Sequence, residues 1–188
     1  MRVVINPGHD GLRDRGAHGL GGLNESEVVQ DVAAMMRDLG GYECKRQGIL
    51  GLWTLTRALK KNPPDVLVSL HANAGTSKRH EAHFYYNDGD EDGSRRHASF
   101  GLASTFTANC SFAEEAKVYS APYAREGRSK PYTPGILRDT ATRAVVLVEL
   151  GFISDPHVEA EMATAEWRVR AANDLHNTLQ AWAKRLLC

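Results

Sequence analysis

Short, continuous apolar runs recur along the chain, and three of them end on a residue that can bind a metal or move a proton. The runs lie at 2–9, 65–71 and 144–152. Runs without alternation predict strands covered on both faces, as in a parallel sheet. Ligands of open α/β sheets gather at the carboxyl ends of the strands. If the three strands lie side by side and parallel, His9, His71 and Glu149 meet in one crevice.

Between these runs, apolar residues recur at the spacing of helices that pack one face on a core. The expected helices cover residues 24–39, 50–61, 97–110 and a last stretch from about 164. Further strands are expected at 42–46 and at 82–86, where apolar and polar residues alternate. This order of strands and helices favours a parallel sheet with right-handed crossovers.

The predicted fold is therefore α/β, with a twisted, mostly parallel sheet of about six strands and helices on both faces. A chain of 188 residues is expected to form one domain, residues 1–188, without a linker to a second unit. Residues 111–142 follow no clear period, and we expect short strands and substrate-facing loops there.

A glycine-rich loop, Asp10 to Leu23, separates the first strand from the first helix. It lacks the spacing of a phosphate-binding fingerprint, and we interpret it as a flexible rim of the crevice, with His18 solvated. The helix after it begins with a capping-box pattern, in which Asn24 is the N-cap and Glu27 reaches back. Glu25 has no such local partner and can point elsewhere.

Net charge and cysteine usage exclude several classes of protein. The formal charge is +0, which argues against a nucleic-acid binder. The three cysteines lack the spacing of a thiolate zinc site or a disulfide framework. No apolar run approaches the roughly 18 residues of a membrane span, and Met1 leads almost directly into the first strand without a signal peptide. We expect a monomer that is made in the cytoplasm without an export signal of its own.

The strand-end residues have the chemistry of a catalytic zinc site. Catalytic zinc takes three nitrogen or oxygen ligands and can lower the pKa of a bound water molecule to about 7. His9, Glu25 and His71 offer two imidazoles and one carboxylate from separate segments, as expected when a sheet assembles the site. Glu149, at the corresponding strand end, is the candidate to accept a proton and pass it to a leaving amine.

Other interpretations of the same residues remain open. Structural histidines are common, and Glu25 with Glu149 could form the carboxylate pair of a glycosidase, although that leaves the two strand-end histidines without a role. His80 and His83 are three residues apart in a strand pattern, whereas the metalloprotease signature needs His-Glu-x-x-His on a helix. We therefore do not expect His80 or His83 to bind metal.

Four motifs, in this order along the chain, resemble those of the zinc-dependent N-acetylmuramoyl-L-alanine amidases, the type-3 family of bacterial cell-wall hydrolases and phage endolysins. They are Asn6-Pro7-Gly8-His9, Gly22-Leu23-Asn24-Glu25, Ser69-Leu70-His71-Ala72-Asn73-Ala74 and Val146-Leu147-Val148-Glu149-Leu150-Gly151-Phe152-Ile153-Ser154-Asp155-Pro156. The resemblance extends over nearly the whole chain and includes Leu137-Arg138-Asp139-Thr140 before the last motif.

This resemblance implies a specific site and reaction. One Zn²⁺ ion per chain would be held by His9, Glu25 and His71, with Glu149 as the catalytic acid and base. The substrate would be peptidoglycan, cut at the amide between muramic acid and the L-alanine of the stem peptide. Within the third motif, Asn73 is the candidate substrate-binding residue.

The chain departs from the family pattern in a few places. Asn6 stands where the family usually has Asp, and Asp10 where it usually has Gly. Neither is an implied ligand, so we expect the reaction to be kept. The absence of a signal peptide and of a wall-binding domain fits a phage or prophage endolysin that reaches the wall after holin-type release. The alternatives are a zinc peptidase that cuts within the stem peptide and a non-catalytic wall-binding module of the same fold.

Overall fold

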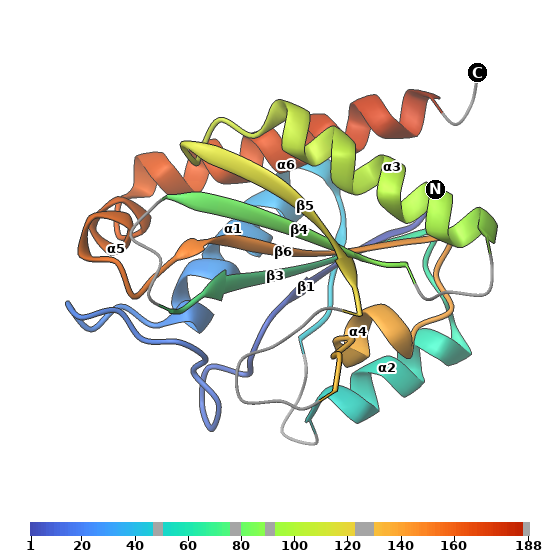
Figure 1. Ribbon diagram of the computed structural model, residues 1–188, viewed down its shortest axis with the longest axis horizontal. Helices are drawn as coiled ribbons and strands as arrows, with labels where there is room; N and C mark the ends of the chain where they lie inside the picture. Colours follow the sequence, from blue (N-terminus) through green and yellow to red (C-terminus); the bar gives the residue numbers. More distant parts are fainter. Residues whose placement is uncertain (47–50, 76–79, 89–92, 123–129, 186–188) are drawn as a thin grey trace.

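A computed structural model describes residues 1–46, 51–75, 80–88, 93–122 and 130–185. Six strands and six helices follow one another in these residues (Figure 1). The strands are β1 (Val3–Pro7), β2 (Glu43–Cys44), β3 (Val66–Asn73), β4 (Glu81–Asn87), β5 (Glu115–Ala121) and β6 (Ala144–Phe152). The helices are α1 (Glu25–Gly40), α2 (Gly51–Lys61), α3 (Gly93–Asn109), α4 (Gly135–Arg138), α5 (Pro156–Met162) and α6 (Ala165–Arg185).

The six strands form one sheet in the order β2-β1-β3-β6-β4-β5, which confirms the predicted α/β fold. β1 and β6 flank β3 and run parallel to it, and β2 runs parallel to β1. β4 is antiparallel to β6, and β5 is parallel to β4. The three strands that carry the strand-end residues are therefore adjacent and parallel, so their carboxyl ends lie side by side at the same end of the sheet.

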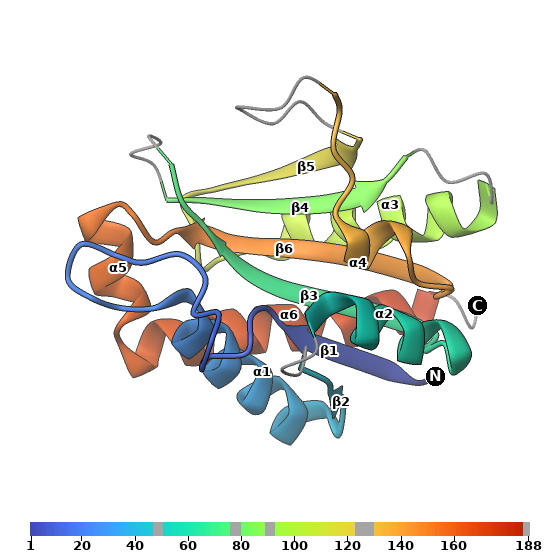
Figure 2. The same ribbon diagram turned by 90° about the horizontal axis from the view of Figure 1, so that it is seen from below.

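Helices cover the two faces of the sheet unequally. Figure 2 shows α3 and α6 on one side of the sheet and α2 and α4 on the other. The first side holds the larger core, where alternate strand residues such as Val68, Phe84 and Val146 are fully buried. On the second side a smaller cluster packs α2 and α4 against β3 and β6, and it includes Leu147. Because side chains two residues apart on a strand share a face, Glu149 lies on the same face as Leu147.

Helix α1 follows the predicted pattern at its core face and at its end, but its start differs. Gly41 adopts a left-handed conformation with φ 64° and donates to the carbonyl of Arg37, which ends the helix. At the start, the side chain of N-cap Asn24 makes no capping bond; its amide nitrogen donates to the carboxylate of Glu27. The predicted capping box is therefore wrong, because these two side chains bind each other and not the backbone.

One other helix start differs from the prediction, one helix was not expected, and one helix start is not tested. Helix α3 begins at Gly93, four residues before the expected start. Helix α5 was not expected, although Asp155 caps it by accepting from His157 N and Pro156 stands in its first turn. Helix α2 begins at Gly51, and the expected first residue, Leu50, lies outside the described residues.

No helix within the described ranges is long and apolar enough to cross a lipid bilayer.

Candidate functional site

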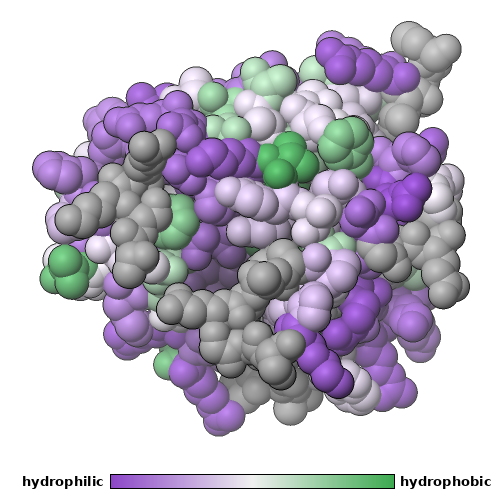
Figure 3. All heavy atoms as spheres, in the orientation of Figure 1, coloured by the Kyte–Doolittle hydropathy of each residue, from purple (hydrophilic) through white to green (hydrophobic). Residues whose placement is uncertain are grey.

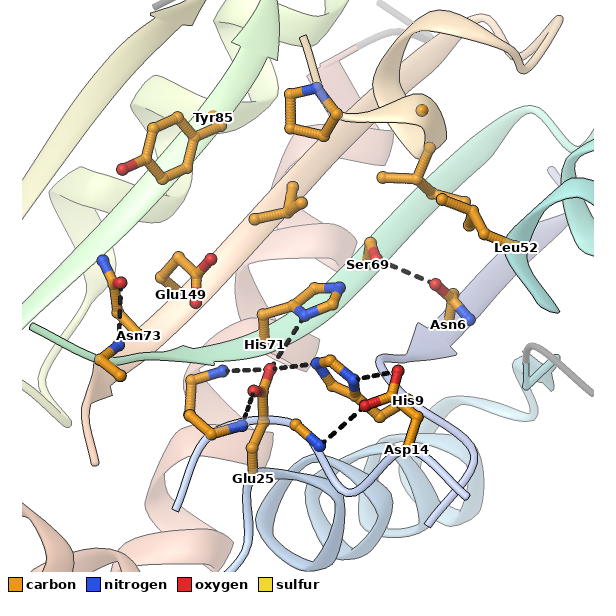
Figure 4. Close-up of a pocket in the computed structure, with 18 of the residues that line it drawn as sticks. Asn6, His9, Asp14, Glu25, Leu52, Ser69, His71, Asn73, Tyr85 and Glu149 are labelled. Atoms are coloured by element: carbon orange, nitrogen blue, oxygen red, sulfur yellow. Dashed lines mark hydrogen bonds and ion pairs between the residues drawn. The ribbon is translucent and has the colours of Figure 1, made fainter. Parts of the chain in front are cut away.

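Three separate segments bring two imidazoles and a carboxylate together. His9 follows β1, Glu25 is the first residue of α1, and His71 lies near the end of β3 (Figure 4). Glu25 Oε1 is 3.1 Å from His9 Nε2 and 2.9 Å from His71 Nδ1. Candidate ligand atoms of the three side chains lie within 4.8 Å of one another. Within the described part of the chain this is the one such group that could hold a metal ion.

Glu25 is held in place by the backbone around it. Its side chain is 5% exposed, and its Oε1 also accepts from Ala72 N at 3.0 Å. Its Oε2 accepts from Ala17 N at 2.8 Å, while Glu25 N donates to Ala17 O at 2.9 Å. A buried carboxylate needs such partners because burial without them is costly. The carboxylate is thus fixed between the two imidazole rings.

His9 owes its orientation to a turn and to a neighbouring carboxylate. Its φ of 62° is unusual for a residue other than glycine, and such conformations cluster at functional sites. Asp14 Oδ2 lies 2.8 Å from His9 Nδ1, which leaves Nε2 facing Glu25. Carboxylate contacts to the second nitrogen are typical of histidines that bind metals. A Cβ on Gly8 would come within 2.4 Å of the His71 ring, so only glycine lets the two strand ends approach this closely.

The electrostatics couple these groups strongly. Burial by itself would lower the pKa of His9, but the carboxylates of Glu25 and Asp14 outweigh it and raise the pKa to about 9. Burial by itself would raise the pKa of Glu25, but hydrogen bonds and charge from His71 and His9 outweigh it and hold that pKa well below its usual range. Without metal, the site therefore keeps an ionised carboxylate beside a protonated imidazole.

Glu149 stands beside this group on the neighbouring strand. It is the register partner of His71 across β3 and β6, so both side chains leave the same face of the sheet. A cleft of about 740 Å³ contains both, together with Asn73 and Tyr85. It opens on the face shown in Figure 3, where hydrophilic residues lie at the base of a hollow. The predicted catalytic carboxylate and the predicted ligands thus line one cleft, and their roles stay predictions.

Asn6, a departure from the family pattern, forms part of the floor of this cleft. The residue is 3% exposed, and its Oδ1 accepts from the Ser69 hydroxyl at 2.9 Å. Its Nδ2 donates to Lys45 O at 2.7 Å and to Pro7 O at 3.2 Å. The amide therefore serves as acceptor and donor at once, which a carboxylate cannot do.

Asn6→Asp is expected to lower the free energy of unfolding by about 1–3 kcal/mol, because it leaves the carbonyls of Pro7 (buried) and Lys45 (partly buried) without this donor. Chemical denaturation of the metal-free protein measures this. Asn73→Asp is the matched control: Asn73 Oδ1 accepts from Ala74 N, and a carboxylate oxygen can do the same. Equal stability of Asn6→Asp and the unmutated chain would contradict this account.

Asp10, the other departure, builds the turn that carries Asp14. Its Oδ1 accepts from the backbone nitrogens of Leu12, Arg13 and Asp14 at 2.8, 2.7 and 3.0 Å. Acceptance of these bonds lowers the pKa of Asp10. The carboxylate therefore shapes the loop and does not enter the site.

The remaining histidines singled out in the sequence have other partners. His83 and His80 are buried and contact Glu81 and Glu161, respectively, each at 3.1 Å. His18 is exposed, as expected, and its Nδ1 lies 2.7 Å from Asn24 Oδ1. The sequence interpretation missed Asp14 and Tyr85. Neither gives a local signal, since the contacts that bring them to the site depend on the folded loop and sheet.

Comparison with known proteins identifies the family. Residues 3–181 match the family described as N-acetylmuramoyl-L-alanine amidase. A cell wall amidase of Bacillus anthracis, itself uncharacterised, is 26% identical over 190 residues, which cover 93% of this chain and 34% of that protein. The chain thus spans about a third of the length of this curated relative.

Solved structures share the fold. The catalytic domain of CwlV, an N-acetylmuramoyl-L-alanine amidase from Bacillus (Paenibacillus) polymyxa var. colistinus, matches with a TM-score of 0.75 at 21% identity, over 98% of this chain and 99% of that one. The apo form of Ami1, an N-acetylmuramyl-L-alanine amidase from Mycobacterium abscessus, gives 0.75 at 19% identity, over 97% and 98%. At these identities the likeness concerns the fold.

Proposed function

The chain belongs to the N-acetylmuramoyl-L-alanine amidase family, and we propose that it hydrolyses the amide between N-acetylmuramic acid and L-alanine in peptidoglycan with one zinc ion. The observation that carries the proposal is the convergence of His9, Glu25 and His71 beside Glu149 in one cleft. Family membership supports the bond that is cut, and the side chains in the cleft support the chemistry.

The residues present fit zinc. Two imidazoles and one carboxylate are the donor set of several catalytic zinc sites, which keep a fourth position for water or substrate. The carboxylate is buried and already faces both rings, so the three groups need no large rearrangement to share an ion. When bound, zinc would supply a Lewis acid that activates water and polarises the scissile carbonyl.

Glu149 would move the proton that hydrolysis requires. Its register position beside His71, and its absence from the group of candidate ligands, support a role next to the metal and not as a ligand. From there it would accept a proton from the attacking water and give it to the leaving nitrogen of L-alanine. Asn73 and Tyr85, which line the same cleft, would contact the substrate around the scissile amide.

The test measures metal content and peptidoglycan digestion on the same preparation, with and without a chelator. We expect close to one zinc per chain and chelator-sensitive release of stem peptides with free L-alanine amino termini. Cleavage between two amino acids of the stem would instead identify a peptidase. Zinc binding with sedimentation on cell walls but no released product would identify a binding module.

We further propose that the protein acts as an endolysin on the bacterial cell wall. The resemblance of its four motifs to cell-wall hydrolases and phage endolysins supports this role. Production of the chain in a bacterium together with a holin, which opens the membrane, is expected to lyse the culture. Survival of cells that contain both proteins, when the purified chain digests the same wall, would overturn the endolysin role and leave the amidase proposal intact.

A further inference from the structure

The glycine-rich loop between β1 and α1 is tied to a distant part of the chain. Glu159, in the first turn of α5, accepts from Gly21 N at 2.7 Å and from Leu23 N at 3.0 Å. Its residue is 5% exposed. A Cβ on Gly19 would lie 2.1 Å from the Glu159 carboxyl carbon, so the loop backbone packs directly on this carboxylate. The loop is fixed by these bonds, which differs from the flexible rim expected from its glycines.

The same loop contacts two of the candidate ligands, Glu25 and His9, and fixes their side chains. Ala17 exchanges two hydrogen bonds with Glu25, one to its side chain and one from its backbone. Asp14, three residues before Ala17, contacts His9 Nδ1, whereas His9 Nε2 faces Glu25. Residues 19–23, which pack on Glu159, are therefore continuous in the chain with residues 14–17, which contact His9 and Glu25.

Helix α5 gives Glu159 a rigid base. Asp155 caps the helix, and the helix follows β6 after a short turn, so Glu159 is anchored to the strand that carries Glu149. A carboxylate at a helix N-terminus that accepts two backbone N–H groups makes charge-assisted bonds, which are stronger than neutral ones. None of the chemistry proposed for the cleft uses this buried carboxylate.

We propose that Glu159 is a positioning residue for the zinc site, which clamps the loop so that Asp14 and Ala17 hold His9 and Glu25 ready for the metal. The inference rests on the proposed zinc site. It assigns to α5 a role in metal affinity, although its carboxylate touches neither the ligands nor the substrate.

Glu159→Gln tests the clamp because it places an amide nitrogen opposite one of the two loop N–H groups. We expect the zinc dissociation constant, measured by competition with a chromophoric chelator, to rise about tenfold, as for outer-shell changes at metal sites. Hydrogen exchange at Gly21 and Leu23 is expected to accelerate. Activity is expected to recover when zinc is raised above the new dissociation constant.

Glu161→Gln is the matched control, since Glu161 lies on the same helix, is largely exposed and contacts His80 instead of the loop. It is expected to keep the zinc affinity of the unmutated chain. Gly19→Ala disturbs the same contact from the loop side, because its Cβ would clash with the Glu159 carboxylate. It replaces Glu159→Gln as the test if that variant does not fold. It is expected to weaken zinc binding similarly.

Two results would overturn the inference, and they can be told apart. If the unmutated chain binds zinc, and both Glu159→Gln and Gly19→Ala bind it within twofold of that affinity while Gly21 and Leu23 exchange faster, the clamp is structural only. The thermal stabilisation by zinc would then be the same in all three proteins. If the unmutated chain binds no zinc, the proposed function fails and this inference fails with it.

Discussion

Glu149→Gln is expected to keep one zinc ion per chain while amide cleavage falls by about 10² to 10⁴-fold, the usual contribution of a positioned acid and base. Glutamine has nearly the same shape as glutamate, so the strand and its packing on β3 are retained. Its amide cannot accept the proton of the attacking water or return one to the leaving nitrogen. Because Glu149 is not one of the candidate ligands, its substitution is not expected to change the zinc affinity.

The measurement combines zinc content with the rate at which amino termini are released from purified peptidoglycan. Glu166→Gln, an exposed carboxylate in the first turn of α6, is the control for the chemical change itself and is expected to digest at the normal rate. Wall digestion by Glu149→Gln at the rate of the unmutated chain would exclude Glu149 as the proton carrier.

The centre of the sheet and its strand ends could be predicted because His71 and Glu149 each follow a run of mainly apolar residues. Val66 to Leu70 and Ala144 to Val148 are almost completely buried, so their sequence records burial on both faces. A residue that follows such a run is expected near the carboxyl ends of the parallel strands. His71 and Glu149 were therefore predictable as neighbours before any contact between them was known.

Contacts of the loops could not be predicted, because their partners lie far apart in the chain. Glu159 binds the backbone of Gly21, 138 residues earlier, and any residue there except proline would offer the same N–H group. The capping-box prediction failed for a related reason. Asn24 and Glu27 are correct in type and spacing, but their side chains bind each other.

The sheet beyond β6 could be predicted only in part: the strand at 82–86 was expected and matches β4, whereas the bounds and partner of β5 were not predicted. β5 is half-buried along most of its length and has no strict alternation, so its residues look like those of a loop. β4 runs antiparallel to β6, and its own residues do not indicate that direction. A period of two identifies a strand but does not give its direction.

His71→Ala is expected to lose zinc and activity together, unlike Glu149→Gln. The substitution removes a candidate ligand, so the loss of zinc affinity should exceed the roughly 10- to 100-fold effect of outer-shell changes. It also removes one of the two imidazoles that face the buried Glu25 carboxylate. Loss of one hydrogen-bond partner from a buried group typically costs about 1–3 kcal/mol, so the metal-free variant should also unfold more easily.

Stability and metal affinity must therefore be measured separately for this variant. Circular dichroism identifies the temperature range in which metal-free His71→Ala is folded, and zinc titration within that range measures affinity alone. His97→Ala, an exposed histidine on α3, is the control and is expected to bind zinc normally. If folded His71→Ala binds zinc as tightly as the unmutated chain, His71 is not a ligand. The carboxylate between the two rings would then be a structural ion pair, and the proposed zinc chemistry would lose its basis.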